Sequence, residues 1–167
     1  INALLRALRP TTPGRIITVI GSNGNRDAHK RPLMGRFAAT ASDVVIVTDD
    51  NPATEDPAII RRAVLAGTRS TAAEVHEVAG RAEAIHLAVR LARAGDTLAI
   101  VGKGDGRHQI MAHGAWRHRA PDEVEGALRN QGRGSAWAAA ARCDRTRAPT
   151  SADGTAGTDA PRRRAPG

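Results

Sequence analysis

Residues 44–57 read VVIVTDDNPATEDP, and this stretch decides how the chain folds. Its first four residues form a short apolar run of β-branched side chains, which is typical of a strand covered on both faces of a parallel sheet. Pro52 and Pro57 fix their own φ angles and disfavour helix just before them, so a stiff loop should follow the strand, with a helix starting at Pro57. Ligands of open α/β sheets bind beyond the carboxyl ends of the strands. The acidic loop therefore indicates a ligand-binding edge, although an Asx-turn that merely connects strand to helix has the same composition.

Two other predicted strands end in polar, glycine-rich loops. Residues 15–20 run into GSNGNRD at 21–27, and residues 97–101 run into GKGDGRHQ at 102–109. The carboxyl ends of parallel strands meet at one edge of a sheet, so the three loops should converge. Arg26, Lys30 and Arg31 place positive charge near the start of the next helix, where an anion could bind. The first loop is neither the dinucleotide fingerprint nor a Walker A loop.

Along the chain, predicted strands alternate with predicted helices. Strands are predicted at 15–20, 44–48, 75–78 and 97–101, and helices at 2–8, 33–41, 57–65, 81–93 and 121–128, with a possible edge strand within 111–119. Strands that alternate with helices favour an α/β fold with a mostly parallel, Rossmann-like sheet.

Five co-linear motifs accompany these elements. They are GNRD at 24–27, KRPLM at 30–34, TDDNPATEDP at 48–57, GRAEAI at 80–85, and GKG at 102–104 followed by Gln109. In this order they resemble the C-terminal domain of the Mur ligases, most closely the UDP-N-acetylmuramoyl-tripeptide synthetases, which add the third, usually diamino, residue of the peptidoglycan stem. The likeness spans about residues 1–129, and it implies a Rossmann-like Mur ligase C-terminal domain.

The resemblance also implies roles for particular residues. Arg26 would hold the carboxylate of the incoming amino acid, as suits a planar guanidinium. A second group would recognise its side chain and close the site: Asp50, Asn51, Pro52, Ala53, Gly102, Asp105 and Gly106. Lys30, Arg31 and Lys103 could face phosphate or nucleotide. No catalytic residue and no metal site are expected in this segment.

Two positions depart from the family pattern. Ligases for meso-diaminopimelate have Arg in the Asp-Asn-Pro-Arg motif, whereas this chain has Ala53, as ligases for L-lysine do. Ala53 cannot grip a distal carboxylate, so we expect L-lysine or a similar diamino acid as the substrate. The His-Glu that follows Gly-Lys-Gly in the family is replaced by Asp105 and Gly106, and Asp105 could substitute for the missing glutamate.

The family activates the carboxylate of the UDP-MurNAc-dipeptide with ATP and Mg²⁺, forming an acyl phosphate that the amine attacks. The 167 residues contain no Walker A pattern. The resemblance therefore implies that ATP and Mg²⁺ are bound mainly by missing N-terminal and central domains, and that this chain is an inactive fragment or truncated copy. The alternatives are a non-catalytic ligand-binding module and a degenerate paralogue from another amide-forming pathway.

Composition predicts where the folded domain ends and where it resides. Residues 130–167 are rich in Ala, Arg, Gly and Pro, and we expect them to be a disordered tail after a domain at 1–129. The tail's seven arginines and three aspartates supply +4 of the net charge of +8. A basic arm could bind nucleic acid, but it lacks interleaved aromatic residues, and we do not expect a nucleic-acid or membrane partner. One cysteine, no long apolar run and no signal-peptide pattern favour a cytoplasmic location.

Overall fold

A four-stranded parallel sheet forms the centre of the protein. The computed structural model describes residues 1–103 and 106–132. The strands are β1 (Ile16–Ile20), β2 (Val44–Val47), β3 (Glu74–Glu77) and β4 (Thr97–Ile100), in the order β3-β2-β1-β4. All three pairings are parallel, with Ile17 opposite Val44 in one pair and Leu98 in another. The predicted α/β fold with a parallel sheet is therefore confirmed.

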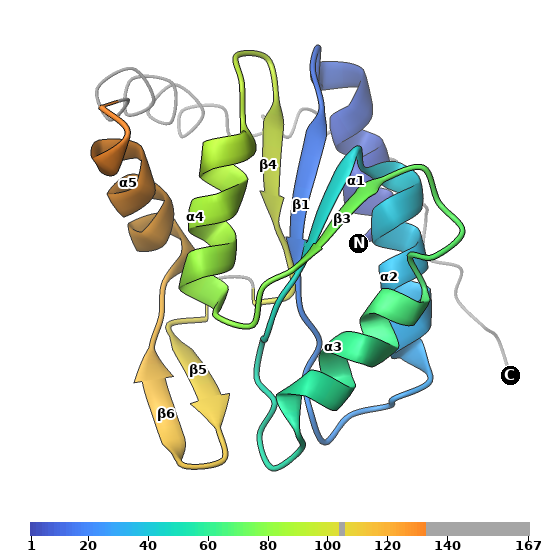
Figure 1. Ribbon diagram of the computed structural model, residues 1–167, viewed down its shortest axis with the longest axis vertical. Coiled ribbons are helices and arrows are strands. Elements are labelled where there is room, and N and C mark those ends of the chain that lie inside the picture. Colours follow the sequence, from blue (N-terminus) through green and yellow to red (C-terminus); the bar gives the residue numbers. More distant parts are fainter. Residues whose placement is uncertain (104–105, 133–167) are drawn as a thin grey trace, which may run out of the picture.

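Helices cover both faces of this sheet (Figure 1). The helical elements are α1 (Asn2–Leu8), the 3₁₀ turn η1 (Arg9–Thr11), α2 (Lys30–Ala41), α3 (Pro57–Ala66), α4 (Arg81–Leu91) and α5 (Ala120–Asn130). One face packs against α1, α2 and α3, and the other against α4, which α5 covers in turn. Among the described residues, no helix has the length and apolar character needed to cross a membrane.

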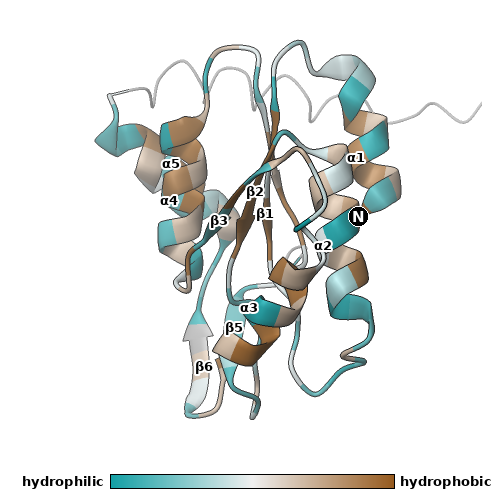
Figure 2. Ribbon diagram, turned by 45° about the vertical axis from the view of Figure 1, so that its right-hand side comes forward, coloured by the Kyte–Doolittle hydropathy of each residue, from teal (hydrophilic) through white to brown (hydrophobic). Residues whose placement is uncertain are grey.

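The core follows the alternation of side chains along the central strands. In β1, Ile16 and Ile20 pack toward α1 and α2, whereas Ile17 and Val19 pack toward α4. All four residues of β2 are buried, as a strand covered on both faces requires. Figure 2 shows the hydrophobic residues concentrated on these central strands and on the helix faces that meet them. The sheet is thus a rigid platform for the loops at its carboxyl edge.

Several predicted boundaries need correction. Helix α2 starts at Lys30 rather than at residue 33, since Pro32 falls in the first turn, where its missing N–H breaks no helical hydrogen bond. Helix α5 begins at Ala120 and extends through Asn130. The boundary predicted after residue 129 stays a prediction, because the tail from residue 133 onward lies outside the described residues.

The segment predicted as a possible edge strand has a different structure. Strands β5 (His108–Met111) and β6 (Gly114–Arg117) pair with each other in an antiparallel hairpin, separate from the parallel sheet. The hairpin lies beyond the carboxyl ends of the strands, which point toward the bottom of Figure 1. It thereby adds a wall to the edge where the three predicted loops end.

Candidate functional site

The three loops predicted to converge do meet at the carboxyl edge of the sheet. The backbone N–H of Gly24, in the first loop, donates to the backbone oxygen of Asn51 at 2.8 Å. Lys103, in the third loop, donates from Nζ to Asn51 Oδ1 at 2.6 Å. A Cβ on Gly24 would collide with the backbone oxygen of Pro52, so only glycine allows this approach. Asn51 is therefore the point where all three loops join.

Asp50 and Lys103 form a buried ion pair beneath this junction. Lys103 Nζ lies 3.3 Å from Asp50 Oδ1, and the two side chains are 4% and 2% exposed. Burial lowers the pKa of Lys103, and the Asp50 carboxylate opposes that shift. Gly102, just before Lys103, has a φ of +108°, and a Cβ there would lie 2.8 Å from Asp50 Oδ2. The ammonium partner of Asp50 is thus supplied by the chain itself.

Asn51 presents one side of its amide outward. Its Oδ1 accepts a second hydrogen bond, from the backbone N–H of Ile110 at 2.9 Å, so the β5–β6 hairpin is tied to the acidic loop. The N–H of Ala53 donates in turn to the oxygen of Ile110 at 3.3 Å. Ala53 has a φ of +53°, an uncommon conformation for a residue other than glycine. Pro52, which lies between Asn51 and Ala53 in the sequence, is buried.

Arg26 lies at the exposed side of the same edge. Its side chain has no hydrogen-bond or ion-pair partner among the described residues. The preceding residue, Asn25, adopts a φ of +54°, and its N–H donates to Glu55 Oε1 at 2.5 Å. That hydrogen bond, with a smaller contribution from Arg31, lowers the pKa of Glu55. Glu55 therefore fixes the backbone from which Arg26 extends.

The three cations predicted to face phosphate differ in exposure. Arg31 is 3% exposed, and its Nη2 lies 2.9 Å from Glu55 Oε2. Lys103 is buried with Asp50, as described above. Lys30 is 72% exposed and has only a loose contact of 3.7 Å with Asp27. The charges of Arg31 and Lys103 are thus engaged within the chain, and that of Lys30 is open to solvent.

Two further polar side chains, Arg81 and His118, are buried behind the edge, and no role was predicted for either from the sequence. Arg81 is 2% exposed and donates from Nη2 to the oxygen of Val101 at 3.1 Å, while its Nε and Nη1 have no partner among the described residues. Burial lowers the pKa of Arg81, and burial followed by repulsion from Arg81 lowers the pKa of His118. Arg81 is the second residue of the GRAEAI motif, and this was the one sequence signal pointing to it.

The rest of the third loop is only partly described. The N–H of Gly106 donates to the backbone oxygen of Lys103 at 3.0 Å, so Gly106 lies close to the junction. Asp105, which could substitute for the glutamate of the family, lies outside the described residues. Within the part of the chain that the structure covers, no group of His, Cys, Asp and Glu side chains could hold a metal ion.

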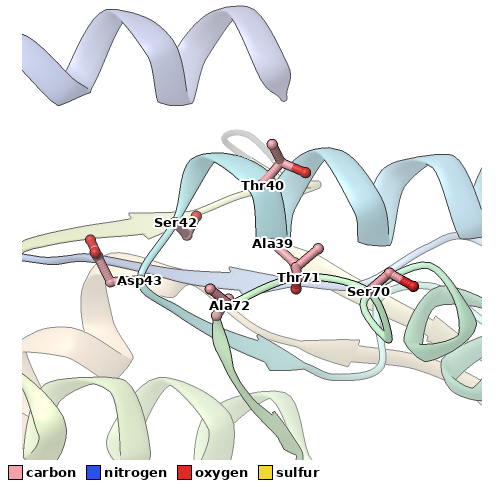
Figure 3. A pocket seen from close by; sticks show the side chains of 8 residues that line it. Ala39, Thr40, Ser42, Asp43, Ser70, Thr71 and Ala72 are labelled. Carbon is pink, nitrogen blue, oxygen red and sulfur yellow. The ribbon is translucent and has the colours of Figure 1, made fainter.

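A pocket of about 330 Å³ lies at the opposite, amino-terminal edge of the sheet (Figure 3). It is lined by the end of α2, the two residues just before β2 and the loop before β3, including Thr40, Ser42, Asp43, Ser70 and Thr71. None of the residues predicted to bind a ligand lines it. The pocket and the residues predicted to bind a ligand therefore lie at opposite edges of the sheet. Ligands of open α/β sheets bind beyond the carboxyl ends of the strands, which favours the carboxyl edge.

Comparison with known proteins identifies relatives of this chain. A family model described as "Mur ligase, glutamate ligase domain" matches residues 1–104. The chain is 47% identical over 125 residues to the UDP-N-acetylmuramoyl-L-alanyl-D-glutamate–2,6-diaminopimelate ligase of Agrobacterium fabrum, covering 75% of this chain and 25% of the relative. It is 43% identical over 136 residues to the ligase of the same name from Corynebacterium efficiens, covering 78% and 26%.

A solved structure is similar as well. A structure titled as a UDP-N-acetylmuramoyl-L-alanyl-D-glutamate–2,6-diaminopimelate ligase superposes with a TM-score of 0.75 at 34% identity, over 78% of this chain and 27% of that one. The chain spans about a quarter of the length of the curated relatives it matches.

Proposed function

Because the chain belongs to the Mur ligase family and carries its C-terminal domain, we propose that it is the amino-acid-binding part of a ligase that adds a diamino acid to UDP-MurNAc-L-Ala-D-Glu. The observation that carries this proposal is the junction of three loops at the carboxyl edge. There the Arg26 guanidinium, which has no partner among the described residues, and the side chain of Asn51 lie beside the buried Asp50–Lys103 pair. The names of the relatives supply the substrate class.

We propose that the residues at this edge contact different parts of the amino acid substrate. The Arg26 guanidinium is open to solvent and suits the α-carboxylate of the amino acid. Ala53, Gly102 and Gly106 lie at the same edge, where they would close the site around the rest of the substrate. Asp50 was predicted to help recognise the side chain of the substrate, but in this structure its carboxylate pairs with the ammonium group of Lys103. We therefore propose that Asp50 contributes through Lys103 rather than by direct contact with the substrate.

The proposal also extends to which diamino acid the ligase adds. The relatives are named for 2,6-diaminopimelate, whereas Ala53 offers no cation for a second carboxylate. We propose L-lysine or a similar diamino acid on that ground. The replacement of His-Glu by Asp105 and Gly106 leaves a degenerate paralogue of another amide-forming pathway as the second candidate.

We propose that ATP and Mg²⁺ are bound elsewhere, because the residues present do not fit them. The 167 residues have no Walker A pattern, and the described residues offer no metal-ligand cluster. Formation of the acyl phosphate would then depend on the part of the relatives that has no counterpart in this chain.

A chimera tests this proposal. Residues 1–132 would replace the matching quarter of the Agrobacterium fabrum ligase, and release of ADP would be measured with UDP-MurNAc-L-Ala-D-Glu and a panel of diamino acids. We expect amine-dependent ADP release from the chimera and none from the 167-residue chain alone. Amine-dependent turnover by the chain alone, or a folded chimera that responds to no diamino acid, would refute the proposal.

A further inference from the structure

The backbone of residues 23–25 in the first loop is held at each of its three positions. Its first carbonyl oxygen accepts from Arg31 Nη2 at 3.3 Å. The next residue donates its N–H to the oxygen of Asn51 at 2.8 Å, and the last donates its N–H to Glu55 Oε1 at 2.5 Å. The segment directly before Arg26 is therefore fixed to the acidic loop and to helix α2.

Asn25 has a conformation that needs this support. Its φ of +54° lies in the left-handed region, which residues other than glycine adopt at a cost. The hydrogen bond to Glu55 stabilises it, and Thr54 Oγ1 adds a second one by donating to Asn25 Oδ1 at 3.0 Å. A return of Asn25 to a negative φ would turn the chain and redirect the side chain of the next residue.

Arg31 anchors the carboxylate that holds Asn25. It extends from the first turn of α2, is 3% exposed, and lies 2.9 Å from Glu55 Oε2 and 3.0 Å from Glu55 Oε1 through Nη2. The same nitrogen reaches the oxygen of Asn23. Burial shields the Arg31 guanidinium from a ligand in solvent, so its effect on the site has to pass through Glu55 and the first loop.

Arg26 depends on this frame because nothing else in the described part of the chain holds it. Its side chain is exposed and has no hydrogen-bond or ion-pair partner there. The direction of the side chain therefore follows from the backbone that carries it. A backbone that is already in the binding conformation lowers the ordering cost of binding.

From this geometry we infer that Glu55 and Arg31 are positioning residues, which keep Asn25 at its positive φ and thereby direct Arg26 toward the amino acid substrate. The inference rests on the proposed function, which makes this edge the amino-acid site. It assigns a role to Glu55, and it gives Arg31 an indirect role in place of a contact with phosphate.

Titration of L-lysine into the full 167-residue chain measures the effect. Backbone NMR shifts at the carboxyl edge give the dissociation constant, and thermal unfolding shows that each variant is folded. Glu55→Ala should bind L-lysine at least about fivefold more weakly, because the binding-competent backbone is less populated, and Arg31→Met should act in the same direction. The controls Glu125→Ala and Lys30→Met remove exposed charges and should change binding less than about twofold.

Two further measurements separate positioning from a general structural role. In an Arg26→Gln background, Glu55→Ala should have little further effect on the affinity for L-lysine, because the residue that it positions is gone. In an Asn25→Gly background, Glu55→Ala should also cost less than it does alone, since glycine adopts a positive φ without help. If Arg26→Gln abolishes binding, the Asn25→Gly background decides.

The failure of the inference differs from that of the proposed function. If folded Glu55→Ala or Arg31→Met binds L-lysine as tightly as the unchanged chain does, the inference is overturned and the proposed function survives. The same holds if the Glu55→Ala effect is undiminished in either background. If L-lysine and 2,6-diaminopimelate shift nothing at the carboxyl edge, the proposed function fails and the inference fails with it.

Discussion

Replacing Asp50 with Asn is expected to lower the free energy of unfolding by about 3–5 kcal/mol, because it leaves two buried cations without their carboxylate. Lys103 is 4% exposed and pairs directly with Asp50. Arg81 is 2% exposed and is also stabilised in its charged form by Asp50. Asn has the shape of Asp and still accepts a hydrogen bond, so the change removes the charge while leaving the packing almost intact. Urea-induced unfolding followed by circular dichroism measures the effect.

The matched control removes an exposed carboxylate. Glu125 pairs with Arg129 at 3.7 Å with both side chains more than half exposed, so Glu125→Gln should cost less than about 1 kcal/mol. The double substitution Asp50→Asn with Lys103→Met removes one cation together with the carboxylate, and it should recover part of the lost stability. If Asp50→Asn were no worse than Glu125→Gln, the carboxylate would be dispensable to the fold and free to bind a ligand.

The second large effect concerns the choice of diamino acid. In the chimera, L-lysine should be preferred over meso-2,6-diaminopimelate, because Ala53 offers no cation to the second carboxylate. Loss of a charge-assisted hydrogen bond costs roughly 1.5–3 kcal/mol, which is about ten- to a hundredfold in selectivity. Ala53→Arg should shift the ratio of kcat/KM toward diaminopimelate, though incompletely, since Gly106 still lacks the glutamate side chain of the family.

The control for this change is Ala53→Gln, which adds length without charge at the same positive φ. It should leave the preference for L-lysine in place. The relatives named above are ligases for 2,6-diaminopimelate, so a preference for L-lysine in the chimera would differ from what their names indicate. A chimera that already favours diaminopimelate with Ala53 in place would show that residue 53 does not decide the substrate.

The sequence predicted the architecture because its signals were local. The apolar run at 44–47 and the alternation of strands with helices need no knowledge of distant contacts, and both are confirmed. Convergence of the three loops followed from the parallel sheet alone. The segment 111–119 was misread because a strand pattern does not identify its partner, and here β6 pairs with β5 in a hairpin.

The site was harder to predict because its charged side chains pair with residues that are distant in the sequence. Lys103 and Arg31 were predicted to face a ligand because they lie in or next to the loops at the carboxyl edge, and lysine and arginine are usually exposed. Lys103 instead reaches Asn51, 52 positions away, and Arg31 reaches Glu55, 24 positions away. Burial of Arg81 could not be read from the GRAEAI motif, since its hydrogen-bond acceptor, the backbone oxygen of Val101, lies 20 positions further along the chain.

A crystal structure of the 167-residue chain soaked with L-lysine or 2,6-diaminopimelate tests the central claim most directly, because it locates the bound amino acid. We predict density at the carboxyl edge, with a carboxylate of the amino acid beside the Arg26 guanidinium. Density instead in the pocket at the amino-terminal edge, beside Ser42 and Thr71, would contradict the assignment of the site.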